Sequence, residues 1–299
     1  MRRLTGSITE YNAETLTLQR PTGREESFSA GAVEHFATTW PEEYLEGRKK
    51  IKAGQHREAI VDLREAVANE GRRWAQRQII ADTVRCYLAV GDLERAGATF
   101  KVIYNDSKFT RHLSVLPIQW WSSNPGATEI EYFQGWLKEA PPLQLVAASR
   151  LLNSSARRQA RQALQDLVIN PDPRIAALAS CQLWREQVAT ATPATIETWR
   201  KQVLVLSPEL RTGPDFVLAN ALARHEKTDE ATELLLRCPI LFGDQSELSA
   251  HSLLMAASLL QNKERPRQAA TLYREIIDRF PKSTVAPQAQ QSLSTLSSP

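Results

Sequence analysis

Apolar residues change their spacing once along this chain, close to residue 39. Before that point apolar and polar residues alternate at period two, as in residues 15–19, and such alternation predicts short β-strands with one buried face. After it, apolar positions recur at the 3.6-residue period of amphipathic helices almost to the end of the chain. The pattern therefore predicts a mainly α-helical protein that begins with a small antiparallel β meander.

Three or four strands are expected in the first 39 residues, at 7–9, 15–19, 27–29 and 33–36. A sheet of this size buries too little surface to be stable alone. We therefore expect its apolar face to pack on the first helices or on another chain. The strand pattern resembles part of a small SH3-like or Sm-like barrel.

Helical periodicity starts after Trp40, where Pro41 and the acidic residues that follow it are typical of a first helical turn. Gly54 and Gly91 are expected at tight turns between paired helices. The predicted helices are 44–53, 56–69, 72–90, 93–104, 129–138, 143–152, 157–168, 174–188 and 284–296.

Small and large apolar residues recur at fixed intervals in four helix pairs. They are Gly47, Ala59, Leu63 and Ala66; Tyr87, Gly91, Ala96 and Phe100; Ala219, Leu222, Ala231 and Leu235; and Ala257, Leu260, Ala269, Tyr273, Ile276 and Pro281. This signature resembles the tetratricopeptide-repeat (TPR) superfamily. The resemblance implies an α-α superhelix, a solenoid of helix pairs, and a role in binding other proteins.

The middle of the chain lacks the TPR signature, although its helical periodicity continues. Asp172, followed by Pro173 and an alanine-rich run, resembles the capped second helix of a HEAT-like unit. A TPR-like unit is expected to resume at Gly213-Pro214. The predicted organisation is a β meander at 1–39, TPR-like pairs at 40–110, a HEAT-like middle at 111–210, and TPR-like pairs with a capping helix at 211–299. It resembles that of bacterial TPR proteins with an N-terminal β module.

Charge and hydropathy argue against several classes of function. The 299 residues carry a formal net charge of +3, so a surface built mainly for nucleic acid or anionic lipid is not expected. The run Leu253–Leu260 is far too short to span a membrane. As written, the chain has no signal peptide, which predicts a cytoplasmic protein; a start codon further upstream would allow export.

No catalytic pattern stands out in the sequence. The segment from His225 to Asp229 has aspartate where a zinc-binding HExxH motif needs its second histidine. The three cysteines, Cys86, Cys181 and Cys238, lie far apart in apolar runs and are expected to be buried thiols. We therefore predict a non-enzymatic protein with no cofactor and no metal.

The inner surface of the first two helix pairs is the leading candidate for partner binding, since TPR proteins commonly bind extended peptides there. The repeat register places on it Tyr44, Arg48, Lys52, Gln78 and Arg85. Three cations and one aromatic ring suit a carboxylate or an acidic peptide. The alternative is a solvated face whose charges pair with Glu42, Glu46 and Asp82. The resemblance does not extend to clamps for chaperone C-termini, which use Lys and Asn where this chain has Tyr44, Arg48 and Asp82.

Two further groups are candidates. Of the adjacent residues Trp120 and Trp121, at most one is expected to be deeply buried, and the other is available as an aromatic wall for a ligand. The favoured alternative is that both serve as packing, because Trp136, Trp184 and Trp199 indicate that this part of the chain uses tryptophan for that purpose. The stripe of arginines at Arg150, Arg157, Arg158, Arg161 and Arg174 suggests the alternative function, a nucleic-acid-binding solenoid. The identity of the partner and the oligomeric state cannot be read from the sequence.

Overall fold

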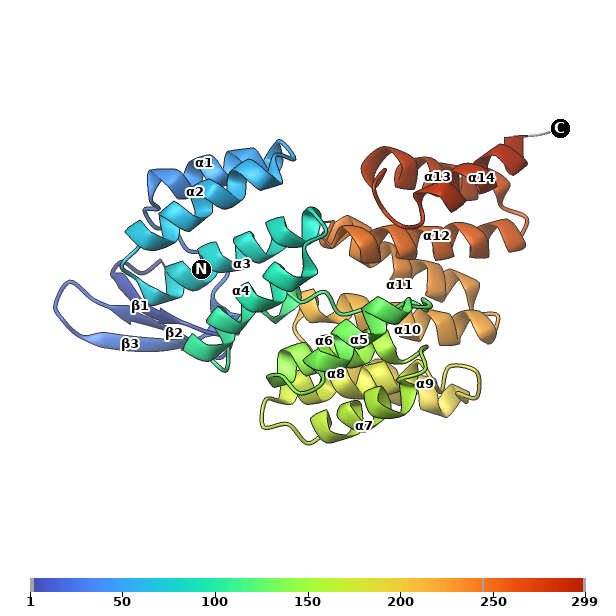
Figure 1. Cartoon of the computed structure of the whole chain (residues 1–299), viewed down its shortest axis with the longest axis horizontal. Coiled ribbons are helices and arrows are strands. Elements are labelled where there is room, and N and C mark those ends of the chain that lie inside the picture. The colour runs from blue at the N-terminus through green and yellow to red at the C-terminus, as the bar shows by residue number, and fades with distance from the viewer. Residues whose placement is uncertain (1–2, 244, 298–299) are drawn as a thin grey trace. The chain divides into compact units, whose positions relative to one another are not determined.

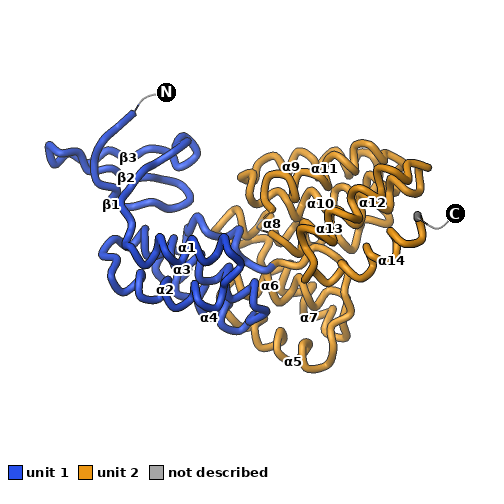
Figure 2. Tube along the Cα trace, turned by 90° about the horizontal axis from the view of Figure 1, so that it is seen from above, with its two compact units in different colours: residues 1–117 blue, residues 118–299 orange. Residues whose placement is uncertain are grey.

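The computed structural model describes residues 3–243 and 245–297. The chain folds as two compact units, residues 1–117 and residues 118–299 (Figure 2). Within the described residues, unit 1 holds one β-sheet and four α-helices, and unit 2 is entirely helical (Figure 1).

The N-terminal sheet is a three-stranded antiparallel meander in the order β1-β2-β3. Its strands are Ser7–Tyr11, Thr15–Gln19 and Glu25–Ser29. The fourth strand expected at 33–36 is wrong: the chain leaves the sheet through a 3-10 turn at Ala30–Ala32, and residues 33–36 form no strand. Phe36 instead packs edge-on against Tyr11 and Trp74, with ring centroids 5.6 Å apart in both pairs.

Four helices follow the sheet in unit 1. They are α1 (Glu42–Lys52), α2 (His56–Asn69), α3 (Arg73–Ala89) and α4 (Leu93–Asp106). Their core contains the predicted signature residues Ala59, Leu63 and Ala66, all completely buried. A Cβ atom on Gly47 would lie 3.0 Å from Leu63, so the close approach of α1 and α2 depends on the absence of a side chain there.

Helix α3 covers the apolar face of the sheet, as expected for a sheet too small to stand alone. Trp74 and Ala75 pack with Leu16 and Leu18 in one buried cluster. The Trp74 indole N–H also donates to the carbonyl of Ile8 over 2.8 Å. The sheet and the first helix pairs therefore share a core.

A buried cation reinforces that core. Arg77 on α3 is almost completely buried, and its guanidinium bonds Glu10 at the end of β1 and Asp106 at the end of α4, the latter over 2.5 Å. Arg73, one turn earlier, reaches the same Asp106 from the surface over 3.1 Å. Arg77 thus joins three elements of unit 1 through charge-assisted hydrogen bonds.

Unit 2 consists of successive antiparallel helices. They are α5 (Ala127–Trp136), α6 (Pro141–Leu151), α7 (Arg157–Leu167), α8 (Pro173–Trp184), α9 (Pro193–Val205), α10 (Pro208–Arg224), α11 (Thr228–Leu241), α12 (Ser246–Asn262), α13 (Pro266–Arg279) and α14 (Ala286–Ser297). Helix α9 lies in a stretch for which the sequence predicted no helix.

The helix pairs of the middle section keep the spacing of the C-terminal ones. Helices α7, α9, α11 and α13 begin at residues 157, 193, 228 and 266, which are 36, 35 and 38 residues apart. Asp172 caps α8 as expected, because its carboxylate accepts from the N–H of Arg174 over 2.9 Å. The middle section therefore differs from the ends in its residues and not in its repeat length.

The expected start of a repeat at Gly213-Pro214 is wrong. Both residues lie inside α10, which begins at Pro208 with proline in its first turn. Gly213 has a different use, since a Cβ atom there would lie 1.9 Å from the ring of Trp120. The absence of a side chain at Gly213 leaves room for the indole of Trp120.

Four helix pairs have the same type of turn between their two helices. Gly54, Gly91, Glu226 and Glu264 all have positive φ, between 58° and 79°. After each of them, the next N–H bonds the carbonyl five residues earlier over 2.9–3.1 Å, as Gln55 does with Lys50 and Arg265 with Leu260. This is the Schellman ending of a helix. The first two pairs and the last two are therefore built alike.

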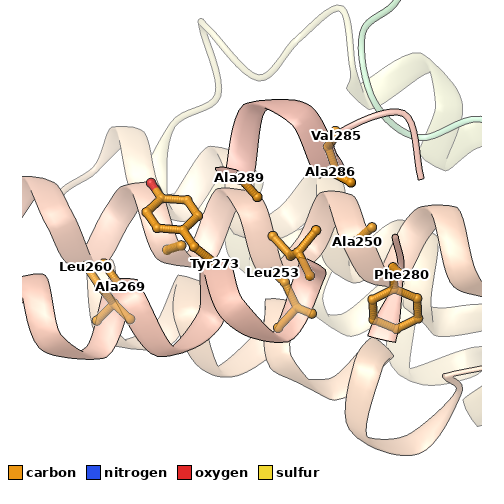
Figure 3. Close-up of a cluster of buried hydrophobic side chains, with 11 residues drawn as sticks. Ala250, Leu253, Leu260, Ala269, Tyr273, Phe280, Val285, Ala286 and Ala289 are labelled. Atoms are coloured by element: carbon orange, nitrogen blue, oxygen red, sulfur yellow. The ribbon is translucent and has the colours of Figure 1, made fainter. Parts of the chain in front are cut away.

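The last pair and the capping helix enclose one cluster of buried side chains (Figure 3). Tyr273 and Ile276 of α13 belong to this cluster, together with Leu253 of α12 and Ala289 of α14. Leu293 and Leu296 pack against the same cluster, which confirms the apolar stripe predicted for the final helix.

Candidate functional site

The candidate surface on unit 1 combines two helical stripes. Arg48 and Lys52 follow Tyr44 at four-residue intervals on α1, and Gln78, Asp82 and Arg85 share a face of α3. The Tyr44 hydroxyl donates to Oδ2 of Asp82 over 2.7 Å. That hydrogen bond brings the two stripes together.

The predicted position of Tyr44 is wrong. The sequence placed it on the inner surface as an aromatic contact for a partner, whereas the residue is 1% exposed and belongs to the core of the first helix pairs. Its ring packs on Trp40, with centroids 4.6 Å apart. The reason is that Tyr44 packs in one cluster with residues of α2 and α3, among them Leu63 and Ile79. Tyr44 positions Asp82 and does not face solvent.

The electrostatics around Tyr44 keep its hydroxyl protonated. Burial raises the pKa of Tyr44 far above its usual range, and the negative charge of Asp82 raises it further. The cations Arg48 and Arg85 act in the opposite direction but do not compensate. The hydroxyl is therefore a permanent hydrogen-bond donor to Asp82.

The accessible part of this surface is cationic. Arg85 pairs with Asp82 over 2.7 Å, which neutralises one of the three cations. Arg48 is exposed, and its guanidinium carbon lies 5.9 Å from the Tyr44 ring centroid. Neither Arg48 nor the exposed Lys52 forms an ion pair among the described residues. We call Arg48, Lys52, Gln78 and Arg85 the α1–α3 face. The expected pairing with Asp82 is present, and a net positive charge remains.

The neighbouring lysines belong to other interactions. Lys49 bonds Glu46 on α1, and Lys50 reaches Asp62 of α2 over 2.7 Å. They leave the charge of the α1–α3 face unchanged.

The adjacent residues Trp120 and Trp121 differ in burial, as expected. Trp120 is 6% exposed, and its ring lies against Gly213 of α10. Trp121 is half-buried and stacks on His251 of α12, with centroids 4.1 Å apart and an interplanar angle of 16°. Trp120 therefore offers no surface to a partner, and Trp121 offers part of one. The role of Trp121 in binding stays a prediction.

Several residues around this segment were missed by sequence reasoning. Ser149, Gln182 and Arg185 bond the backbone of residues 119–121. Ser149 lies on α6, whereas Gln182 and Arg185 lie at the end of α8, and the three residues share no motif. One signal was available: polar residues such as Gln182 stand at core positions of otherwise apolar helices.

Most arginines of the middle stripe are paired. Arg157 and Arg161 both bond Glu186, over 2.6 and 3.7 Å. Arg174 pairs with Asp172, and the largely buried Arg150 reaches Glu129 over 3.5 Å. Only Arg158 of this group lacks a partner in the described part of the chain. The stripe is therefore weaker as a continuous cationic surface than its sequence suggests.

The histidine and the cysteines considered as candidates for chemistry take part in turns and in the buried core. His225 ends α10 at a turn and bonds the carbonyl of Ala191 over 2.7 Å. The three cysteines are buried, and burial raises the pKa of the Cys86 thiol to about 12. No group of three or more metal-ligating side chains occurs among residues 3–243 and 245–297. Within the same residues, no helix is both long and apolar enough to cross a membrane.

One buried carboxylate stands apart. Asp215 on α10 is 5% exposed and accepts no hydrogen bond from any described residue. Burial raises its pKa to about 6, although the charges of Arg237 and Arg211 lower it.

The sequence profile of the tetratricopeptide repeat matches residues 251–283. These residues run from α12 through α13 and contain the buried Tyr273 and Ile276. No curated protein matches the chain.

Proposed function

We propose that this chain, whose residues 251–283 match the tetratricopeptide repeat, is a non-enzymatic scaffold for protein–protein interaction. TPR-like helix pairs commonly serve that purpose, and a stack of such pairs offers an extended binding surface. The α1–α3 face is the proposed contact for an acidic peptide or an acidic surface of a protein partner.

One observation carries this proposal. Arg48 and Lys52 stand on one stripe of α1, exposed and without ion pairs among the described residues, beside the ordered Tyr44–Asp82–Arg85 contact. A guanidinium held near a rigid hydrogen-bonded cluster loses little side-chain freedom when it binds a carboxylate. Gln78 adds an amide that can bond a peptide backbone.

The alternative function, binding of nucleic acid by the arginine stripe, has less support. Glu186 bonds two of its arginines, and the formal net charge of the chain is only +3. Strong dependence on salt would be its signature.

The proposal is tested by co-purification from the native cell. We compare the wild type with the charge-reversal pair Arg48→Glu and Lys52→Glu, which leaves the buried Tyr44 untouched. Arg64→Glu on α2 is the matched control, because Arg64 is also exposed and unpaired in the described structure. Loss of specific partners from the double variant alone supports the α1–α3 face. An identical set of partners from all three proteins excludes it.

A further inference from the structure

Residues 119–121 lie across four helices of unit 2. The helices α6, α8, α10 and α12 follow one another in space, each in contact with the next. Gln119 bonds α6 and α8, and Trp120 packs on α10. Trp121 accepts a hydrogen bond from Arg185 at the C-cap of α8 and stacks on His251 of α12. A short segment without regular secondary structure thus touches one helix from each successive pair.

The backbone of this segment is held by side chains. The N–H of Gln119 donates to Oγ of Ser149 over 3.0 Å, and its carbonyl accepts from Gln182 over 3.1 Å and from Arg185 over 3.0 Å. Arg185 also donates to the carbonyl of Trp121 over 2.8 Å. Such bonds do not depend on the side chains of the segment, so another peptide backbone can make them.

The two indoles supply the selective contacts. Trp120 occupies the space that any side chain at position 213 would need, since a Cβ atom on Gly213 would lie 1.9 Å from its ring. Trp121 stacks on the imidazole of His251. A glycine opposite one indole and an aromatic ring opposite the other select a tryptophan-containing peptide.

The surface beneath the segment is polar where simple packing would be apolar. Ser149 and Gln182 are completely buried, and Arg185 has no carboxylate partner among the described residues. Burial lowers the pKa of Arg185 to about 10. A buried cation is costly unless hydrogen bonds satisfy it. Here the carbonyls of Gln119 and Trp121 do so, together with the carbonyl of Ser149 and the amide of Gln182.

We propose that Ser149, Gln182, Arg185, Gly213 and His251 form a peptide-binding site, which we call the indole site. It takes an extended segment with tryptophan at its centre, and residues 119–121 occupy it as an internal ligand. A partner protein that presents such a segment binds when the internal segment is displaced. The indole site lies in unit 2 and is independent of the α1–α3 face.

The test supplies the segment as a separate molecule. The probe is a fluorescent peptide of residues 115–125, and the protein is the full chain carrying Trp120→Ala, which empties the place of the indole. We expect the peptide to bind this variant at least tenfold more tightly than it binds the wild type, whose site is filled. A peptide with alanine in place of both tryptophans should not bind.

A second substitution provides the matched control. Adding Gly213→Ala to Trp120→Ala puts a methyl group where the indole of the peptide must lie, and alanine is also the better helix former. We expect this double variant to fold as well as the single one and to bind the peptide at least tenfold more weakly. Equal binding by the two variants, or no binding by either, would overturn the proposal.

Folding of the variants is checked by cooperative thermal unfolding. If Trp120→Ala does not fold, Trp120→Leu replaces it in the same comparison, because leucine is apolar and still leaves part of the indole's place open. Failure of both to fold would show that the segment is an indispensable part of the core, and the proposal would then be rejected.

Discussion

The hydroxyl of Tyr44 donates to the carboxylate of Asp82 over 2.7 Å and thereby joins the first helices of two successive pairs. Tyr44→Phe removes this bond from a buried place. We expect the free energy of unfolding to fall by about 1–2 kcal/mol. Chemical denaturation measures the change. Tyr87→Phe on α3, the helix that carries Asp82, is the control, because the half-buried Tyr87 has no hydrogen-bond partner in the described structure. Equal decreases in the free energy of unfolding of the two variants would show that this hydrogen bond does not contribute to stability.

Arg77 and Arg73 share Asp106 but differ in burial, since their side chains are 4% and 77% exposed. Arg77→Met removes the buried cation that joins Glu10 to Asp106, so Glu10 loses its ion pair and Asp106 keeps only the exposed Arg73. We expect it to lower the free energy of unfolding by about 3 kcal/mol or more. Arg73→Met should cost less than about 1 kcal/mol. A comparable cost for both would mean that burial does not decide the strength of these ion pairs.

Glu226 and Glu264 have the positive φ that Gly54 and Gly91 have in the equivalent turns. A residue with a Cβ atom is strained there by about 1–2 kcal/mol, and glycine would relieve the strain at an entropic cost of about 0.5–1 kcal/mol. Glu226→Gly and Glu264→Gly should therefore each stabilise the protein by about 0.5–1 kcal/mol, measured by denaturant unfolding. Gly54→Ala should destabilise it by a similar amount. Destabilisation by both glycine substitutions would contradict this reading of the turns.

Asp215 makes stability depend on pH. Because burial raises its pKa to about 6, the native state keeps the proton at pH values where the unfolded chain, with a pKa of about 3.9, has released it. The contribution of this group to the free energy of unfolding therefore decreases as pH rises from about 4 to 6, by about 3 kcal/mol in all.

Asp215→Asn should consequently stabilise the protein at pH 7 by up to about 3 kcal/mol and have little effect at pH 4. Asp278→Asn is the control, since Asp278 is exposed and has no partner in the described residues. Thermal unfolding of both variants at the two pH values gives the result. The same shift for Asp215→Asn at pH 4 and pH 7 would show that its charge is not the cause.

Local features of the fold were predictable and contacts between distant segments were not. Helix α2 has the bounds 56–69 predicted from its amphipathic pattern, and Gly54 and Gly91 stand in the turns expected of them. These features depend on neighbouring residues. The burial of Tyr44 depends on how two helix pairs stack, which a repeat register does not reveal.

The indole site shows the same limit. Gly213 next to Pro214 suggested the start of a TPR-like unit, because those residues usually interrupt helices. The role of Gly213 is to leave room for the ring of Trp120, which lies 93 residues earlier in the chain, and only the folded structure shows this contact. Ser149, Gln182 and Arg185 likewise gain their role from a segment that is distant in sequence.

The proposal that the α1–α3 face binds an acidic partner is tested most directly by the affinity of a captured partner for purified protein. Titration calorimetry compares the wild type, Arg64→Glu, and the double variant Arg48→Glu with Lys52→Glu at one salt concentration. We predict at least tenfold weaker binding by the double variant, a loss of about 1.4 kcal/mol or more, and a change of less than twofold for Arg64→Glu. Equal affinity of all three proteins would contradict the account.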